Sequence, residues 1–277
     1  MIRYSTHIIS ILLGLFALFY PASTVQAREQ WKILAKGMEY CVFHVSPPPE
    51  TGNGKIHIVR VDTAQAKLRL LLASEHNKKA RTTAKWCKDF NLVIAINAGM
   101  FQQDYLTNVG YLRNGFYIQN KRWSSKYKSV LAFDPKKNGL PTVIMVDLEE
   151  PDAMKKLGDY NAVVQNLRLM KGNGINVWEK SEKRWSEAAV GTDDQGRVLF
   201  LFCALPYPMW EFNEAVKSFG LGVTRMMHME GGPTASLSIR SREVNVDLAG
   251  SFETAVGPDE TSSELSPIPN VIGVQMK

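Results

Sequence analysis

The chain has 277 residues, of which 45% are hydrophobic and 22% charged, and its formal net charge is +6. This composition is that of a globular protein with a sizeable core, and a mature chain of about 250 residues suits one domain. The basic residues are scattered among acidic ones without a nucleic-acid-binding motif, so we expect no nucleic-acid partner.

The first 27 residues have the pattern of a secretory signal peptide. Arg3 precedes an apolar run over residues 8–20, and small residues follow up to Ala27. The run is too short for a comfortable membrane span. We therefore expect cleavage after Ala27 and a mature domain over residues 28–277 that is periplasmic or secreted from a bacterium and has no stable membrane span. An uncleaved anchor is the alternative.

The next part of the chain is read mainly as strands. Runs of alternating or branched apolar residues predict strands over residues 55–62, 67–74 and 92–101. Between the last two, "TTAKWCKDF" predicts a helix over residues 82–90 that a threonine caps.

The second half continues with short strands and two more helices. Strands are expected over residues 110–118, 129–133 and 142–147, and a short helix after Pro151. Residues 187–205 predict a hairpin around "DDQG", and residues 209–220 a helix that ends at Gly220. Strands then follow over residues 221–229 and 271–277, with a polar loop between them. The sum is a single α+β domain with a mixed β-sheet and a few covering helices.

The three cysteines are too few for a disulfide framework. Cys203 lies in an apolar run and is expected to be buried. A Cys41–Cys87 disulfide is one alternative in an oxidising compartment, although spacing alone does not establish it. The chain has no Cys-x-x-Cys or His-x-x-x-His spacing, so we expect no zinc site.

The segment "MHMEGGPTASL" places an acid at the end of an apolar strand. Burying a carboxylate there is costly unless something pairs with it. His228 lies two residues before Glu230, so strand alternation places both side chains on one face, where they can act as an acid/base pair. Gly231 and Gly232 then form a tight turn that lets another group approach the backbone. The alternatives are a buried structural pair or ligands for a hard cation.

Two other apolar runs end or break at polar residues. In "INAGMF", Asn97 can orient a ligand and Gly99 leaves room for it; the alternative is an asparagine that satisfies backbone groups in a turn. In "VVQNLRLM", Gln165 and Asn166 interrupt the run, and Arg168 can grip a phosphate with two N–H groups. An arginine exposed on a strand face is the alternative for Arg168.

Five motifs, taken in order, resemble the phosphodiester glycosidase family: "INAGMF", "GYLRNG", "VVQNLRLMKGNGINVW", "EAAVG" and "MHMEGGPTASL". Asn97, Gly99 and Phe101 fit an Asn-Gly-Gly-Phe-Phe-like segment of that family. The run from Glu230 to Thr234 fits its Asn-Leu-Asp-Gly-Gly-Gly-Ser-like segment. The resemblance covers roughly residues 56–277.

The resemblance implies an exported hydrolase that cleaves the glycosidic bond of a sugar-1-phosphodiester, either N-acetylglucosamine-like or derived from exopolysaccharide. Together with the chemistry of the residues, this hypothesis makes Glu230 and His228 catalytic. The predicted substrate-binding residues are Asn97, Gly99, Gln165, Asn166, Arg168, Gly231, Gly232 and Thr234. Asn97 and Asn166 would hold sugar hydroxyls, and no resident cofactor is implied, although the sequence leaves a divalent cation open.

The chain departs from the family pattern at several of these positions. Glu230 stands where the family has aspartate, and His228 replaces an asparagine. Glu187 stands beside "AAVG", where the family commonly has an arginine that suits a phosphate. Met100 replaces the second glycine of the early motif and narrows the cleft.

Two other functions are alternatives to this hypothesis. The first is a non-catalytic exported glycan- or envelope-binding protein on the same fold. The second is a metal-dependent phosphoesterase, but it needs a cluster of Asp and His ligands, and the other histidines are scattered along the chain.

Overall fold

The computed structural model describes residues 30–46, 53–252 and 264–277. The predicted signal peptide and the first half of the predicted polar loop over residues 257–270 lie outside these residues. No helix within the described ranges is long and apolar enough to span a membrane.

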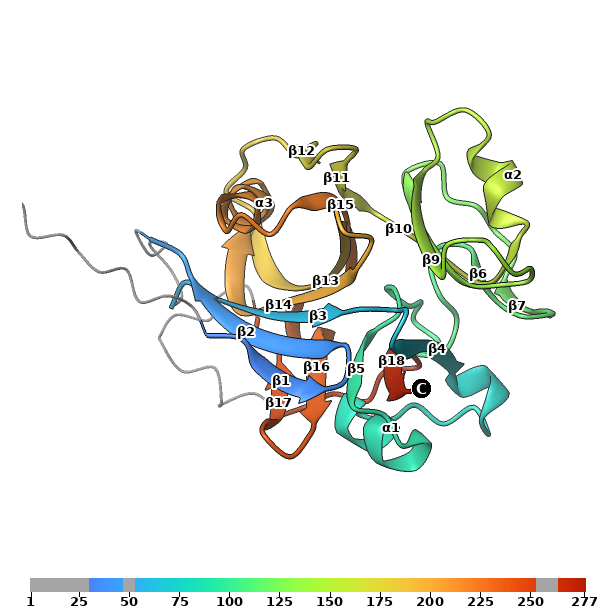
Figure 1. Cartoon of the computed structure of the whole chain (residues 1–277), viewed down its shortest axis with the longest axis horizontal. Helices are drawn as coiled ribbons and strands as arrows, with labels where there is room; N and C mark the ends of the chain where they lie inside the picture. The colour runs from blue at the N-terminus through green and yellow to red at the C-terminus, as the bar shows by residue number, and fades with distance from the viewer. Residues whose placement is uncertain (1–29, 47–52, 253–263) are drawn as a thin grey trace, which may run out of the picture.

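Three β-sheets form the frame of the molecule (Figure 1). The large sheet has eight strands in the order β1 (Lys32–Ala35), β2 (Met38–His44), β3 (Lys55–Val61), β14 (Val198–Pro208), β13 (Arg184–Asp193), β15 (Val223–Gly231), β11 (Arg168–Lys171) and β12 (Ile175–Asn176). The second sheet has the order β17 (Asn245–Ala249), β16 (Ser236–Arg240), β5 (Ile94–Asn97), β18 (Asn270–Met276) and β4 (Ala66–Leu72). The third has the order β7 (Tyr117–Asn120), β6 (Leu112–Asn114), β10 (Tyr160–Asn166), β8 (Ser129–Pro135) and β9 (Val143–Asp147).

The prediction of a mixed sheet is wrong. Every strand pair of the three sheets within the described residues is antiparallel. Antiparallel neighbours can be joined by short turns, whereas parallel ones need long crossovers that are usually helical. The described residues form few helices that could serve as crossovers. Strands β13 and β14 are joined by a short turn at the predicted "DDQG" instead. The α+β assignment stands, with the balance strongly toward β.

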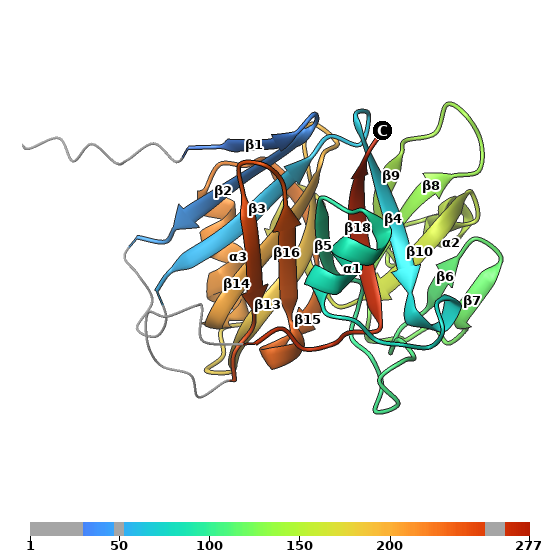
Figure 2. The ribbon, with the colours of Figure 1, turned by 90° about the horizontal axis from the view of Figure 1, so that it is seen from below.

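A single core joins the three sheets. Val190 of β13, Ile96 of β5 and Leu131 of β8 belong to one cluster of buried hydrophobic residues. Figure 2 shows β4 and β18 of the second sheet next to β9 and β10 of the third, with α1 (Thr83–Phe90) packed over the second sheet. Because one apolar cluster draws on all three sheets, they cannot separate without exposing it.

Three helices cover the outer faces, as the sequence predicts. Thr82 caps α1 by accepting a hydrogen bond from the Lys85 N–H at 3.2 Å. The short helix α2 (Ala153–Leu157) packs on the third sheet, and α3 (Met209–Ser218) packs Phe212 and Val216 against the large sheet. Two 3-10 turns, η1 (Ala73–Glu75) and η2 (Gly232–Thr234), complete the described elements.

The cysteines form no disulfide. Cys41 packs in the cluster between the large sheet and α3, whereas Cys87 packs under α1 in a separate cluster. The bridge considered from the sequence is therefore wrong. Cys203 is buried as predicted.

Candidate functional site

The predicted site residues lie where the chain passes from one sheet to another. Strand β15 leaves the large sheet at Gly231, and η2 leads directly into β16 of the second sheet. Strand β10 leaves the third sheet at Asn166, and β11 starts at Arg168 in the large sheet. The two crossings touch, because the backbone N–H of His228 donates to the carbonyl of Leu167 at 3.0 Å.

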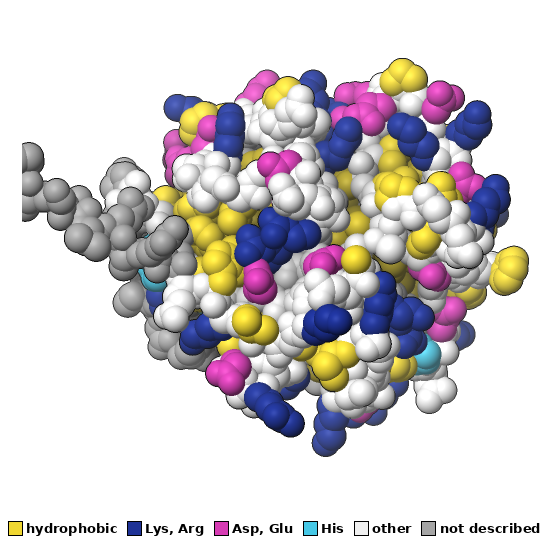
Figure 3. Space-filling view, in the orientation of Figure 1, with side chains coloured by type: hydrophobic (Ala, Val, Ile, Leu, Met, Phe, Trp, Pro, Cys, Tyr) yellow, Lys and Arg dark blue, Asp and Glu magenta, His cyan; other side chains and the backbone are white. Residues whose placement is uncertain are grey.

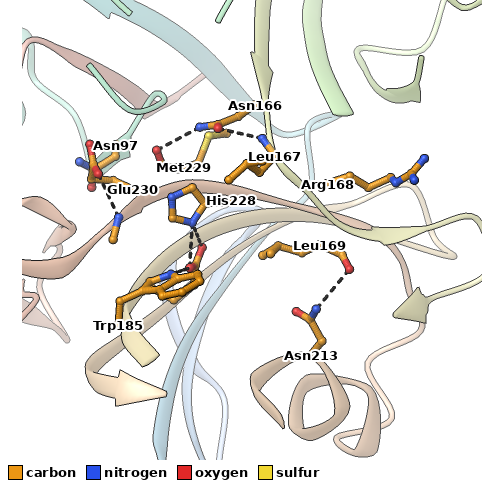
Figure 4. Close-up of polar contacts among 12 residues, drawn as sticks. Asn97, Asn166, Leu167, Arg168, Leu169, Trp185, Asn213, His228, Met229 and Glu230 are labelled. Atoms are coloured by element: carbon orange, nitrogen blue, oxygen red, sulfur yellow. Dashed lines mark hydrogen bonds and ion pairs between the residues drawn. The ribbon is translucent and has the colours of Figure 1, made fainter. Parts of the chain in front are cut away.

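A buried carboxylate–imidazole pair is the centre of this junction (Figure 4). The Nδ1 of His228 lies 2.8 Å from both Oε1 and Oε2 of Glu187. The indole Nε1–H of Trp185 donates to Oε2 of the same carboxylate at 2.9 Å, and the Trp185 ring stands edge-on to the imidazole. The Glu187 and His228 side chains are 0% and 5% exposed, so an ion pair in this position is screened little by solvent.

Glu230 lies next to this pair but is not hydrogen-bonded to it in the structure. Its Oε1 accepts the backbone N–H of Gly231 at 3.0 Å, and the residue is 9% exposed. A carboxylate with one hydrogen bond and little water is poorly stabilised in its charged form. Burial accordingly raises the pKa of Glu230 to about 7, while the nearby His228 charge and the Gly231 N–H oppose the rise.

The same-face prediction for His228 and Glu230 is wrong. Along β13, Ala188 pairs with Glu230 and the adjacent Ala189 pairs with His228, so the register shifts there and Met229 has no partner of its own. Paired residues share a face and adjacent residues do not. The bulge at Met229 therefore interrupts the alternation that the two-residue spacing implies.

Burial shifts the proton affinities of the whole cluster. Burial raises the pKa of Glu187, and the charge of His228 opposes that shift. For His228, burial disfavours the charged ring, but the Glu187 carboxylate and the charge of Glu230 together outweigh burial and raise the pKa. Burial and the Glu230 charge also raise the pKa of Tyr127. The cluster therefore retains protons at a pH where free carboxyls lose them.

Asn97 and Asn166 fasten the two crossings to neighbouring strands. Asn97 Nδ2 donates to the carbonyl of Thr234 at 3.0 Å, and its Oδ1 accepts the Ser236 N–H at 2.8 Å. Asn166 Nδ2 donates to the carbonyl of Met229 at 3.1 Å. Both side chains are buried and bonded to backbone, which matches the alternative considered for Asn97. Their binding of sugar hydroxyls stays a prediction, with no contact of this structure in its favour.

The glycines of the two motifs differ in what surrounds them. Gly99 has φ +105°, and a Cβ there would lie 2.5 Å from Oδ1 of Asn108, so this amide fills the room that the sequence suggested for a ligand. A Cβ on Gly231 would lie 2.6 Å from the Trp185 ring. Gly232 has φ +66° and open space around it, which agrees with an accessible tight turn.

Thr234 closes the turn after Glu230. Its hydroxyl donates to the carbonyl of Gly231 at 3.4 Å, and its own carbonyl accepts the Asn97 amide. The residue thus helps to hold the turn, and contact with a substrate is untested.

Gln165 and Arg168 are engaged in contacts within the protein. The Gln165 amide accepts the N–H groups of Tyr111 and Ser124 and donates to the carbonyls of Ser124 and Tyr127. All four hydrogen-bonding positions are used, so Gln165 shapes the loop that carries Tyr127. The Nη1 of Arg168 lies 2.5 Å from Asp147 and 2.8 Å from Glu149, and the side chain points away from His228 (Figure 4). The proposed phosphate grip by Arg168 is not supported by this geometry, and neither is an exposed arginine, because its side chain is only 14% exposed.

Three residues of the junction were not assigned to the site from the sequence: Trp185, Glu187 and Tyr127. Glu187 was noticed only as a departure from the family pattern. Its partner is His228, which also departs from the family pattern. Two departures in one sequence, an acid and an imidazole, are the signal in the sequence that could have indicated their pairing. Nothing in the sequence pointed to Tyr127.

Within the described ranges, no group of three or more His, Cys, Asp or Glu side chains is arranged to hold a metal ion.

Comparisons with known proteins identify relatives of this chain. The family model described as phosphodiester glycosidase matches residues 90–275, which include all of the junction. A comparison with curated proteins finds none that matches.

Two solved structures have a similar fold. The first is the zebrafish N-acetylglucosamine-1-phosphodiester alpha-N-acetylglucosaminidase catalytic domain, auto-inhibited by its pro-peptide. It is 12% identical, with a TM-score of 0.62 over 90% of this chain and 88% of that one. The second is a hypothetical protein from Synechocystis, 11% identical, with a TM-score of 0.57 over 90% of this chain and 64% of that one. At these identities the likeness concerns the fold.

The raised pKa of Glu230 predicts a pH-dependent contribution to stability. An unfolded glutamate keeps its ordinary pKa of 4.5, whereas the folded value is about 7, so between these values the folded state binds more protons. Stability from this group is therefore greatest at low pH and falls as the pH rises through that window. The free energy of unfolding of Glu230→Gln, compared with that of wild type, should therefore increase by about 3 kcal/mol between about pH 4 and about pH 8.

Urea denaturation at the two pH values measures this difference. Exposed Glu179, changed to Gln, is the matched control and should show less than about 0.5 kcal/mol of such a gain. An equal pH dependence in wild type and Glu230→Gln would mean that Glu230 titrates normally in the folded protein.

Proposed function

The chain belongs to the phosphodiester glycosidase family, and from this premise we propose that it is an exported hydrolase that cleaves the glycosidic bond of a sugar-1-phosphodiester. The zebrafish protein of similar fold is named for N-acetylglucosamine-1-phosphodiester. We take this compound class as the first candidate substrate, with an exopolysaccharide-derived phosphodiester as the second. The proposal assigns the catalytic role to Glu230 and His228.

The observation that carries the proposal is the state of Glu230 at the end of β15. The acid is nine-tenths buried, lies beside an open glycine turn at Gly232, and has a pKa of about 7. Breaking a bond at a sugar's anomeric carbon builds positive charge like that of an oxocarbenium ion. A carboxylate with a pKa near neutrality can stabilise that charge or take a proton from the attacking water.

Glu187 acts as a positioning residue for His228 in this proposal. The Nδ1–H of the imidazole donates to the Glu187 carboxylate, which fixes the ring and leaves Nε2 as the nitrogen that can exchange a proton. Trp185 holds the same carboxylate from its other side. The charge of the fixed imidazole lowers the pKa of Glu230, and in this proposal His228 tunes or relays the proton of that acid.

The leaving group explains why one acid can suffice. Cleavage at the sugar carbon turns the phosphodiester into a phosphate monoester, which departs as a stable anion, so its oxygen needs less protonation than the alkoxide of an ordinary glycoside. Arg168 is committed to Asp147 and Glu149, and the cation acting on Glu230 is His228. We infer that phosphate recognition relies on groups other than Arg168.

We infer that the domain extends over residues 28–277, beyond the part that the family model matches. Strands β1 to β3 precede residue 90 but continue the large sheet through the pairing of β3 with β14. The signal-peptide pattern of the first 27 residues supports a periplasmic or secreted location. A glycan-binding protein without activity on the same fold is the alternative, which the departures at Glu187 and Met100 keep open.

The substrate proposal predicts that the protein releases free N-acetylglucosamine from UDP-N-acetylglucosamine. Glu230→Gln keeps the size of the side chain and an oxygen to accept the Gly231 N–H, but it cannot ionise. Turnover should fall by at least about 100-fold in this variant and be unchanged in Glu179→Gln. Product release is measured by chromatography, with and without a chelator.

Each pattern of results has one meaning. The proposal predicts that wild type and Glu179→Gln are active with or without chelator, whereas Glu230→Gln is inactive. Full activity of Glu230→Gln would remove Glu230 from the mechanism. Loss with chelator would show that a metal takes part. Folded but inactive wild type that still binds the sugar would support the binding protein instead.

The proposed role of Glu230 also predicts a pH profile. A carboxylate that stabilises charge or activates water must be ionised, so kcat/KM should rise about tenfold per pH unit below its pKa and level off above about pH 7. The diphosphate of UDP-N-acetylglucosamine stays fully ionised over this range and adds no limb to the profile. A profile that falls through pH 7 would instead assign Glu230 the role of a general acid.

A further inference from the structure

The hairpin formed by β6 and β7 carries large apolar side chains into solvent. Gly115, with φ +60°, and Phe116 form its two-residue turn. Phe116 is fully exposed, Ile118 is 48% exposed, and Tyr117 between them is also exposed. A phenylalanine at a turn with no protein contact forgoes the stabilisation that burial would bring.

A second loop brings another aromatic side chain to the same margin. Gln119 of β7 donates from Nε2 to the carbonyl of Leu106 at 3.0 Å and accepts the Asn108 N–H at 2.9 Å. These bonds hold the loop that contains exposed Tyr105 beside β7. We call Tyr105, Phe116, Tyr117 and Ile118 the hairpin patch.

The hairpin patch lies at an edge of the molecule. Strand β7 is the outermost strand of the third sheet and lies at the right margin of Figure 1. Figure 3 shows a hydrophobic side chain standing out from this margin beyond its neighbours. Single exposed hydrophobic residues are common, but exposed Phe116 at the turn, with Tyr117 and Ile118 on the two faces of the edge strand behind it, makes a projecting apolar tip that indicates an interaction surface.

The chain segment that carries the hairpin and the loop after it is basic. Between Asp104 and Asp134 it contains no acidic residue, whereas it contains the basic residues Arg113, Lys121, Arg122, Lys126 and Lys128. Arg113 donates to backbone carbonyls and Lys128 faces Glu149 at 3.9 Å, so the exposed charges that remain are Lys121, Arg122 and Lys126.

Two carboxylates border the patch, and both are engaged locally. Glu75 accepts a hydrogen bond from Asn114 at 2.8 Å, next to the turn of the hairpin. Asp104 accepts three hydrogen bonds from Leu106 and Thr107 within its own loop.

We propose that the hairpin patch docks on a bilayer surface that contains anionic phospholipids. Aromatic and branched side chains partition into the interfacial region, and lysine and arginine pair with anionic headgroups. A second copy of this chain would bring the same positive charges together. A peptide strand could pair with the edge of β7 but would not cover Phe116, which lies beyond the last ladder pair, Asn114 with Tyr117.

A fluorescent label at the turn tests the docking directly. The three native cysteines are buried, so Phe116→Cys provides one reactive site for an environment-sensitive fluorophore. The full chain is mixed with vesicles of phosphatidylglycerol and phosphatidylcholine, or of phosphatidylcholine alone. We expect a blue shift with the anionic vesicles only, and we expect high salt to reverse it. Ile175→Cys on β12, where Ile175 is 50% exposed, is the matched control and should not respond.

The local readout separates docking from other attachment. The apolar segment at residues 8–20 can bring the full chain to either kind of vesicle, but it would not place the label at position 116 in the interface. No shift at 116 with anionic vesicles, or equal shifts at 116 and 175, would overturn the proposal. A concentration-dependent shift without vesicles would assign the patch to self-association and would also overturn it.

Charge variants test the basic residues. Lys121→Gln with Arg122→Gln should weaken vesicle binding on the order of tenfold, measured as the lipid concentration for half the blue shift at position 116. The control pair Lys136→Gln and Lys137→Gln removes the same charge from an exposed loop elsewhere. It should change this lipid concentration less than about twofold. Equal effects of the two pairs would indicate non-specific attraction and contradict a docking site.

Discussion

The burial of two carboxylates around one imidazole is the constraint on which the candidate site depends. Glu187 and His228 come from adjacent strands of the large sheet and meet at 2.8 Å with almost no solvent contact. Removing either partner would leave the other charged or polar group buried without compensation, which costs several kcal/mol. Glu230 lies beside this pair, and the hydrogen bond it receives comes from the Gly231 N–H. Burial therefore raises its pKa, against the opposing charge of His228.

The junction is held by backbone contacts that also hold the fold together. Asn97 joins the end of β5 to the turn after β15, and Asn166 joins the crossing between β10 and β11 to β15. The same residues therefore keep three sheets in register and set the position of Glu230. This explains why polar residues interrupt apolar strands at both places. An amide that bridges two backbone segments is stabilising when buried, whereas an unpaired one would be destabilising.

The sequence was informative where structure is local. Thr82 and its helix, the hairpin around "DDQG", and the strand that ends at Glu230 all depend on spacing within a few residues, and all were predicted. The Glu187–His228 pair depends on strand register across 41 residues and on a bulge at Met229, neither of which a periodic pattern specifies. Gln165 and Arg168 are similar cases. Their residue types suggested a ligand, but their partners were backbone groups and carboxylates from other elements that only the folded chain brings near.

The proton state of His228 is the most direct test of the account, because the roles of Glu187 and Glu230 both depend on it. Its imidazole nitrogens can be followed by NMR across pH in wild type and in Glu187→Gln, with the resonance assigned by loss in His228→Gln. The account predicts that His228 stays doubly protonated above pH 6.5 in wild type, with its Nδ1 proton shared with Glu187, and that its pKa falls in Glu187→Gln. A His228 that titrates near 6.5 in both proteins would contradict the buried ion pair and the site built on it.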